Sequence, residues 1–80
     1  MDTSIRDFIE ATGLTKSEIE RLTGISNGNL STRARGKLST PRGERMLFRL
    51  LTLMYEDGWD VERIMKKIRD KVLDTDHDSK

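Results

Sequence analysis

The sequence has no cysteine, one proline and few aromatic residues, and each shortage limits what the chain can be. Without cysteine, disulfide frameworks, zinc–thiolate sites and cysteine nucleophiles are excluded, and a reducing cytoplasm is the expected location. One proline and six glycines among 80 residues argue against a linker or collagen-like sequence. The apolar runs are too short to cross a bilayer. Early charges such as Arg6 and Glu10 predict that there is no signal peptide.

What the sequence has in abundance is charge, and the charge is unevenly distributed. Charged residues make up 36% and apolar residues 34% of the chain, which predicts one small domain with a lean core. The formal net charge is only +1. Residues 31–50, however, carry six basic side chains and one acidic side chain, between two mildly acidic flanks. Such a basic segment is compatible with binding of a polyanion.

Capping residues and glycines divide the chain into five expected helices. The helical spacing of apolar residues places them from about residue 4 to Gly13, from Thr15 to Gly24, over residues 26–35, from Pro41 to about Glu56, and from Val61 to Val72. No segment alternates apolar and polar residues over the length of a strand. The predicted class is therefore all-α, with one domain over residues 1–73 and a flexible acidic tail over residues 74–80.

Local patterns add detail to these helices. Ser4 with Asp7, and Thr15 with Glu18, have the spacing of capping boxes. Thr40 is the expected N-cap of the fourth helix, with Pro41 at the first helical position.

The apolar residues of the fourth helix predict its buried face. Leu47, Leu50, Leu51 and Met54 form an i, i+3, i+4, i+7 stripe, beside Phe48 and Tyr55. For Tyr55 and Trp59, packing in the core or in a dimer is favoured over base stacking. We expect most of the methionines to fill the core.

Residues 15–37 have the organisation of a helix-turn-helix, with two short helices joined by a tight turn at Gly24. Ile19 and Leu22 anchor the first helix, and Leu30 anchors the second. Ile25 closes the corner between them. One face of the second helix, residues 26–35, is then free to lie in a major groove.

These residues resemble the Cro/CI-type (XRE) helix-turn-helix family. The resemblance rests on the run from Leu14 to Ser26, on Leu30-Ser31 and on Arg35-Gly36-Lys37, and it covers about residues 5–56. It implies a compact, lambda-repressor-like bundle that binds DNA. Many members are repressors of phages and mobile elements, and they are usually dimers on palindromic operators.

The sequence departs from the family pattern at two positions. Glu20 stands where the family usually has alanine at the helix crossing, and Arg33 stands where it usually has an aliphatic residue. Ala34 lies four residues after Leu30 and is the expected replacement in the core. We hypothesise that Glu20 pairs with Arg33, while the core and DNA remain open as other surroundings for Arg33.

The expected DNA contacts follow from this geometry together with the resemblance. Asn27 is the best base reader, because an amide can bond adenine through two hydrogen bonds. The predicted base contacts are Asn27, Gly28, Ser31 and Thr32. The predicted backbone contacts are Thr15, Lys16, Ser17, Ser26, Arg35, Lys37 and Arg42. Of the basic cluster Arg33, Arg35, Lys37 and Arg42 we expect three to bind DNA, whereas Arg49 is expected to face solvent.

Catalytic and metal sites find no support in the sequence, so we expect no enzyme, cofactor or metal. His77 is the only histidine. Asp74, Asp76 and Asp78 begin like a calcium loop, but they lack the glycine and the closing glutamate that such a loop requires. One domain fills the chain, so no small-molecule effector is expected.

These observations together predict a sequence-specific binder of double-stranded DNA, most simply a repressor of phage or mobile-element type. A homodimer is expected, because one recognition helix buries little surface. Such a dimer reads a pseudo-palindromic operator with half-sites about 34 Å apart. The fifth helix either closes the core or forms the two-fold interface. The alternatives are a protein-binding module with the same fold, such as an antitoxin-like or host-factor inhibitor, and a purely structural helical protein.

Overall fold

The computed structural model describes residues 2–78, and the side chains of residues 2–72. Within this range the chain forms helices joined by loops, with no strand. The helices are α1 (Ser4–Thr12), α2 (Lys16–Thr23), α3 (Asn27–Ala34), α4 (Arg42–Glu56) and α5 (Val61–Asp78). The prediction of a small all-α bundle is confirmed. None of the helices in this part of the chain is both long enough and apolar enough to cross a membrane.

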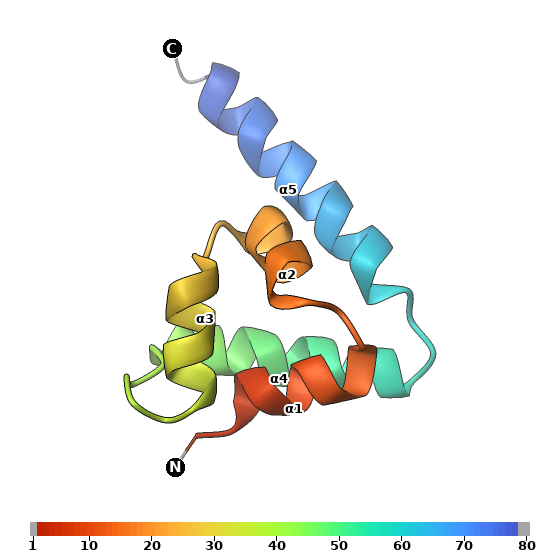
Figure 1. The fold of residues 1–80 in the computed structure, drawn as a ribbon. Coiled ribbons are helices and arrows are strands. Elements are labelled where there is room, and N and C mark those ends of the chain that lie inside the picture. The colour runs from red at the N-terminus through yellow and green to blue at the C-terminus, as the bar shows by residue number, and fades with distance from the viewer. Residues whose placement is uncertain (1, 79–80) are drawn as a thin grey trace.

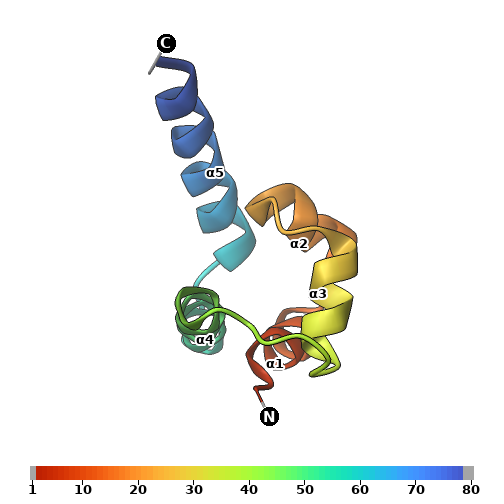
Figure 2. The same cartoon turned by 90° about the vertical axis from the view of Figure 1, so that its left-hand side faces the viewer.

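The helices form two groups that share one core. Figure 1 shows α1 lying along α4, with α2 and α3 set at an angle to this pair. The first half of α5 packs against α2 and α4, and its second half projects beyond the bundle. In the view of Figure 2, α4 lies on one side of the bundle and α3 on the opposite side.

The core is built around two phenylalanine rings. Phe8 of α1 and Phe48 of α4 are fully buried, with ring centroids 5.2 Å apart and ring planes inclined by 60°. Tilted pairs of this kind are favourable beyond the area they bury. The other buried apolar side chains come from all five helices and from the α1–α2 loop: Ile5, Leu14, Ile19, Leu22, Leu30, Leu51, Val61 and Met65.

Several predicted helix ends are confirmed. Gly13 and Gly24 end α1 and α2 in the left-handed region, at φ of 73° and 80°, where a residue with a Cβ is strained. Thr15 and Glu18 form the predicted capping box of α2. Ser26 caps α3 by accepting a hydrogen bond from the Asn29 amide at 3.2 Å.

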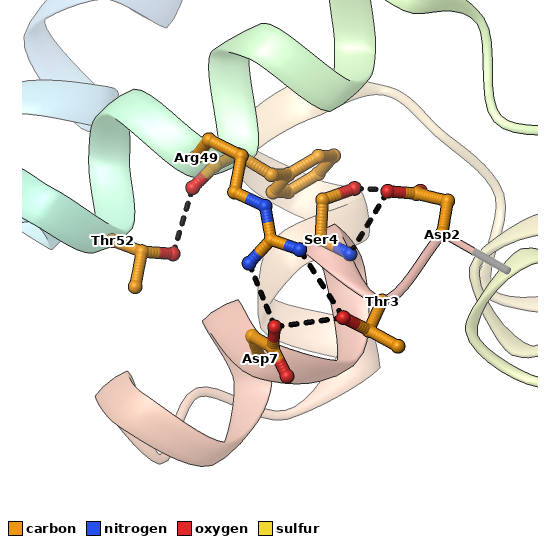
Figure 3. A network of polar contacts seen from close by, with 7 residues as sticks. Asp2, Thr3, Ser4, Asp7, Arg49 and Thr52 are labelled. Carbon is orange, nitrogen blue, oxygen red and sulfur yellow. Dashed lines mark hydrogen bonds and ion pairs between the residues drawn. The ribbon is translucent and has the colours of Figure 1, made fainter.

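The start of α1 differs from the prediction, because Ser4 and Asp7 do not form a capping box. Ser4 is buried, and its hydroxyl donates to Asp2 Oδ2 at 2.8 Å (Figure 3). Asp7 instead accepts a hydrogen bond from the Thr3 hydroxyl at 2.9 Å. Burial acts to raise the pKa of Asp2, but hydrogen bonds from the Ser4 hydroxyl and amide outweigh it and hold this pKa below its ordinary value.

The start of α4 is also shifted. The helix begins at Arg42, with Pro41 as the N-cap residue and no side-chain cap, while Thr40 is buried in the preceding loop. The predicted cap at Thr40 is therefore one residue too early.

The predicted buried stripe of α4 is confirmed at Leu51 and Met54 and wrong at Leu47 and Leu50. Phe48, Leu51 and Thr52 form the buried face, whereas Leu47 and Leu50 are exposed. Apolar residues of this helix also lie outside its buried face, so their spacing alone does not select the face. Pairing of Phe48 with Phe8 turns the helix toward α1.

Other apolar side chains are also at the surface. Met46, expected in the core, is exposed, and so are Tyr55 and Trp59, for which packing in a dimer is the expectation that stays open. Of the remaining methionines, Met65 is buried and Met54 is partly buried against the core, while Met1 lies outside the described residues.

Two further expectations need revision. Arg49 does not simply face solvent: its Nη1 lies 2.7 Å from Asp7 Oδ2, and its Nη2 donates to Thr3 Oγ1 at 3.1 Å (Figure 3). The fifth helix continues past Val72 to Asp78. The expected flexible tail therefore begins inside this helix, and its last two residues, 79–80, lie outside the described residues.

Candidate nucleic-acid interface

The turn between α2 and α3 consists of Gly24, Ile25 and Ser26. The Gly24 amide donates to the Glu20 carbonyl at 2.8 Å and closes the end of α2. Ile25 packs partly buried against the core. Leu30 is the one buried residue of α3. Gly28 and Asn29 are exposed, and Asn27, Ser31 and Thr32 keep part of their surface, so the start of this helix is available for contact with another molecule.

Two predicted contact residues meet where α2 and α3 begin. Asn27 Nδ2 donates a hydrogen bond to Ser17 Oγ at 3.2 Å, although the two residues are ten apart in the sequence. The bond uses one of the two amide hydrogens of Asn27 and leaves its Oδ1 as an acceptor. The predicted base reader and a predicted backbone contact are thus held side by side.

Gly28 follows Asn27 in the first turn of α3 and is exposed. It does not have a positive φ, and an added Cβ would meet no atom of the chain within 4 Å. A glycine inside a helix costs about 1 kcal/mol relative to alanine. The fold therefore gives no reason for this glycine, whereas close approach of another molecule to the α3 backbone would.

The remaining predicted base contacts are less free. The Thr32 hydroxyl donates to the Gly28 carbonyl at 2.8 Å, so toward DNA it acts as an acceptor while this bond lasts. Ser31 is partly exposed on the same helix.

The N-terminus of α2 already holds a carboxylate. Glu18 Oε1 accepts hydrogen bonds from the Thr15 amide at 3.2 Å and from the Thr15 hydroxyl at 2.9 Å. These bonds hold the pKa of Glu18 below its ordinary value. Both polar groups by which Thr15 would contact a phosphate are thus bound to Glu18, which leaves its neighbours Lys16 and Ser17 as the better placed pair.

Arg33 is paired with Glu44 of α4 and not with Glu20, so the predicted Glu20–Arg33 pair is wrong. Arg33 Nη1 bonds Glu44 Oε1, and the two side chains are only 13% and 28% exposed. Glu20 is exposed on α2. Ala34 packs partly buried against the core, as expected. The charge of Arg33 is thereby neutralised, and the arginine ties the end of α3 to the start of α4.

The predicted basic flank remains exposed after α3. Arg35 and Lys37 lie in the loop that follows the helix, and Arg42 opens α4. Arg45 was not among the predicted contacts, yet it is exposed one turn after Arg42 on the same side of α4 and lines a surface hollow with it. The i, i+3 spacing of these two arginines is the sequence signal that identifies Arg45 as part of this flank.

Comparison with known proteins gives no assignment: no protein-family model, curated protein or solved structure matches the chain. Among the residues that the structure describes, no cluster of histidine, aspartate and glutamate side chains has the composition of a metal site.

Proposed function

We propose that the chain binds double-stranded DNA sequence-specifically through α3, which lies in the major groove. The observation that carries this proposal is the polar, uncovered start of α3. This helix buries only Leu30, and it begins beside the N-terminus of α2 with Asn27 and Gly28 in its first turn. A short, polar helix presented in this way has the size and chemistry that a major groove admits.

We assign two separate roles to the proposed contacts: some position the protein on the duplex, and others read the bases. Contacts to phosphate fix the register of a protein on the duplex but carry no sequence information, whereas contacts to base edges do. Positioning is assigned to a set that lies on both sides of the recognition helix: Lys16, Ser17, Ser26, Arg35, Lys37, Arg42 and Arg45. Base reading is assigned to Asn27, with Gly28 allowing close approach and with smaller contributions from Ser31 and Thr32.

The proposed role is transcriptional repression. A domain of this size acts by occupying an operator, and its own concentration sets the occupancy. The resemblance to Cro/CI-type proteins supports a repressor of phage or mobile-element type.

Selection from random duplexes tests DNA recognition directly. Purified protein at physiological salt should retain a defined short sequence. Asn27→Ala should relax the preference at one position, at a cost of about 1–3 kcal/mol for the matching base. Asn29 is the matched control, because it is exposed two residues further along α3 and is not among the assigned contacts. Folded protein that enriches no sequence would refute the proposal.

Salt dependence separates DNA binding from binding of a protein partner. Contact with roughly five phosphates should give a slope of about −4 to −5 when the logarithm of the binding constant is plotted against that of the salt concentration. An interface of apolar contacts is much less sensitive to salt. A shallow slope for the selected duplex would therefore argue against the assigned phosphate contacts.

A further inference from the structure

The side of α4 that faces away from the core is apolar and uncovered. Met46, Leu50 and Leu53 are 63%, 56% and 63% exposed, and their i, i+4, i+7 spacing places them in one row along the helix. Phe48, Leu51 and Thr52 are buried on the opposite side. The exposed row continues over two turns in the middle of α4, so it is a surface and not a set of isolated side chains. We refer to Met46, Leu50 and Leu53 as the outer row.

The fold itself does not require the outer row. Polar residues at these three positions would keep every buried contact of α4, and a contiguous exposed apolar patch of this kind generally marks an interaction site. The charges at its two ends indicate what covers it. Arg42 lies at the start of α4, and Glu56 and Asp57 lie at its end, all three exposed.

We propose that the outer row is a dimer interface that pairs α4 with α4 of a second copy in antiparallel orientation. A two-fold axis near Leu50 sets Met46 against Leu53 of the partner subunit and Arg42 against the partner's Glu56 and Asp57. A parallel pairing sets arginine against arginine and carboxylate against carboxylate, which is repulsive. The charges at the two ends of this surface are therefore complementary to each other only in the antiparallel arrangement.

The size of the surface sets the expected strength. A helix of 15 residues is about 22 Å long. One face of such a helix buries less than the roughly 800 Å² per partner of a standard interface. We therefore expect a weak, reversible dimer with a dissociation constant in the micromolar range.

The arrangement of the helices gives this dimer a specific consequence. Since α4 and α3 lie on opposite sides of the bundle (Figure 2), pairing through α4 leaves both α3 helices uncovered at the two ends of the particle. The pairing engages Arg42, so in the dimer the phosphate contacts on this flank fall to Arg35, Lys37 and Arg45. The dimer then holds two separate duplex segments, whereas a pseudo-palindrome with adjacent half-sites needs both α3 helices on one side. This consequence alone rests on the proposed function; the pairing does not.

Sedimentation of the full chain without DNA tests the pairing. Wild-type protein should show a monomer–dimer equilibrium. Leu50→Glu places two carboxylates at the two-fold axis and should weaken the dimer by about tenfold or more. Circular dichroism checks that the variant is folded, as expected for a side chain outside the core. The matched control is Ile68→Glu on the exposed part of α5, which should leave the dimer unchanged.

A charge exchange tests the register. Arg42→Glu and Asp57→Arg should each weaken self-association, whereas a mixture of the two variants should restore it, because each chain then offers the charge that the other lacks. A monomeric wild type at all concentrations, dissociation by Ile68→Glu, or failure of the mixture to associate would each overturn the proposal. Because no DNA is present, none of these outcomes depends on the proposed function. Capture of a second duplex by a DNA-bound dimer tests the bridging consequence separately.

Discussion

The two exposed helix surfaces, on α3 and on the outer side of α4, differ in chemistry and in the free energy of their hydration. The free surface of α3 is made of amide, hydroxyl and glycine positions that remain hydrated without cost. The outer row of α4 consists of large apolar side chains, whose exposure is unfavourable in proportion to their area. A polar surface is suited to reversible contact with a wet, charged ligand, and an apolar one is suited to association with another protein surface.

The same two helices are also held to the bundle in different ways. Leu30 is the single buried residue of α3, and the Arg33–Glu44 pair fastens the end of that helix. Three buried residues hold α4, together with the exposed Arg49–Asp7 pair. The α3 helix therefore depends on fewer contacts than the helix that carries the apolar surface.

The largest expected effect comes from comparing the same leucine-to-alanine substitution on each helix in turn. Leu30→Ala should lower the free energy of unfolding by about 2–5 kcal/mol, since it opens a cavity under α3. Leu50→Ala, on the outer row, should change the stability of the monomer by less than about 0.5 kcal/mol. Chemical denaturation at low protein concentration measures both. Equal losses would show that the two leucines are not buried and exposed as described.

The ion pair at the end of α3 should give the next largest effect. Glu44→Gln leaves the partly buried Arg33 without its counter-charge and should cost about 1–3 kcal/mol. This is less than for a fully buried pair, because both side chains keep some exposure. Arg33→Met combined with Glu44→Gln should recover most of the loss.

A matched control for this pair lies on α5. Glu62 pairs with Lys66 at 3.3 Å on the exposed surface of that helix, so Glu62→Gln should cost at most about 0.5 kcal/mol. If Glu44→Gln costs no more than this control, the pair does not hold α3 in place.

Substitution of Gly28 should change the stability of the protein and its affinity for DNA in opposite directions. Gly28→Ala should raise the free energy of unfolding by about 0.5–1 kcal/mol, because the site has open space and an ordinary helical backbone. The same change should weaken binding to the selected duplex, since the added methyl group keeps the α3 backbone away from DNA. Gly43→Ala, in the first turn of α4 with equally open surroundings, is the control for the gain in stability. Unchanged DNA affinity of Gly28→Ala would remove the backbone-approach role.

The two ends of α2 and the start of α3 were predictable because they depend on neighbouring residues. Thr15 with Glu18, Gly24 and Ser26 act within one helical turn of their own positions, so their types and spacing suffice. The predicted class and the separation of α2 from α3 followed from these local signals.

Apart from the caps of α1 and α4, the errors concern contacts between residues that are distant in sequence. Arg33 pairs with Glu44 and Arg49 pairs with Asp7, and neither pair is visible before α3, α1 and α4 are placed relative to one another. The buried face of α4 was mistaken for the same reason. Leu50 and Leu51 are equivalent as residue types, and only the placement of α4 against the rest of the core determines which of them is covered. The assigned DNA contacts remain predictions of the sequence and its resemblance.

The smallest expected effect is the response of the Arg49–Asp7 pair to acid. A hydrogen bond from Arg49, followed by one from Thr3, holds the pKa of Asp7 below its ordinary value. A carboxyl group whose pKa is lowered by folding stabilises the native state above its unfolded pKa of about 3.9, and this contribution is lost as the pH falls through the lower, folded value. Thermal unfolding at about pH 6 and about pH 3 should therefore show a smaller loss for Asp7→Asn than for wild type. Asp2 and Glu18 have lowered pKa values as well, so the variant should keep part of the acid sensitivity. The same dependence in both proteins would mean that α4 is held by its buried face alone, and the contrast with α3, which relies on a charge pair, would become sharper.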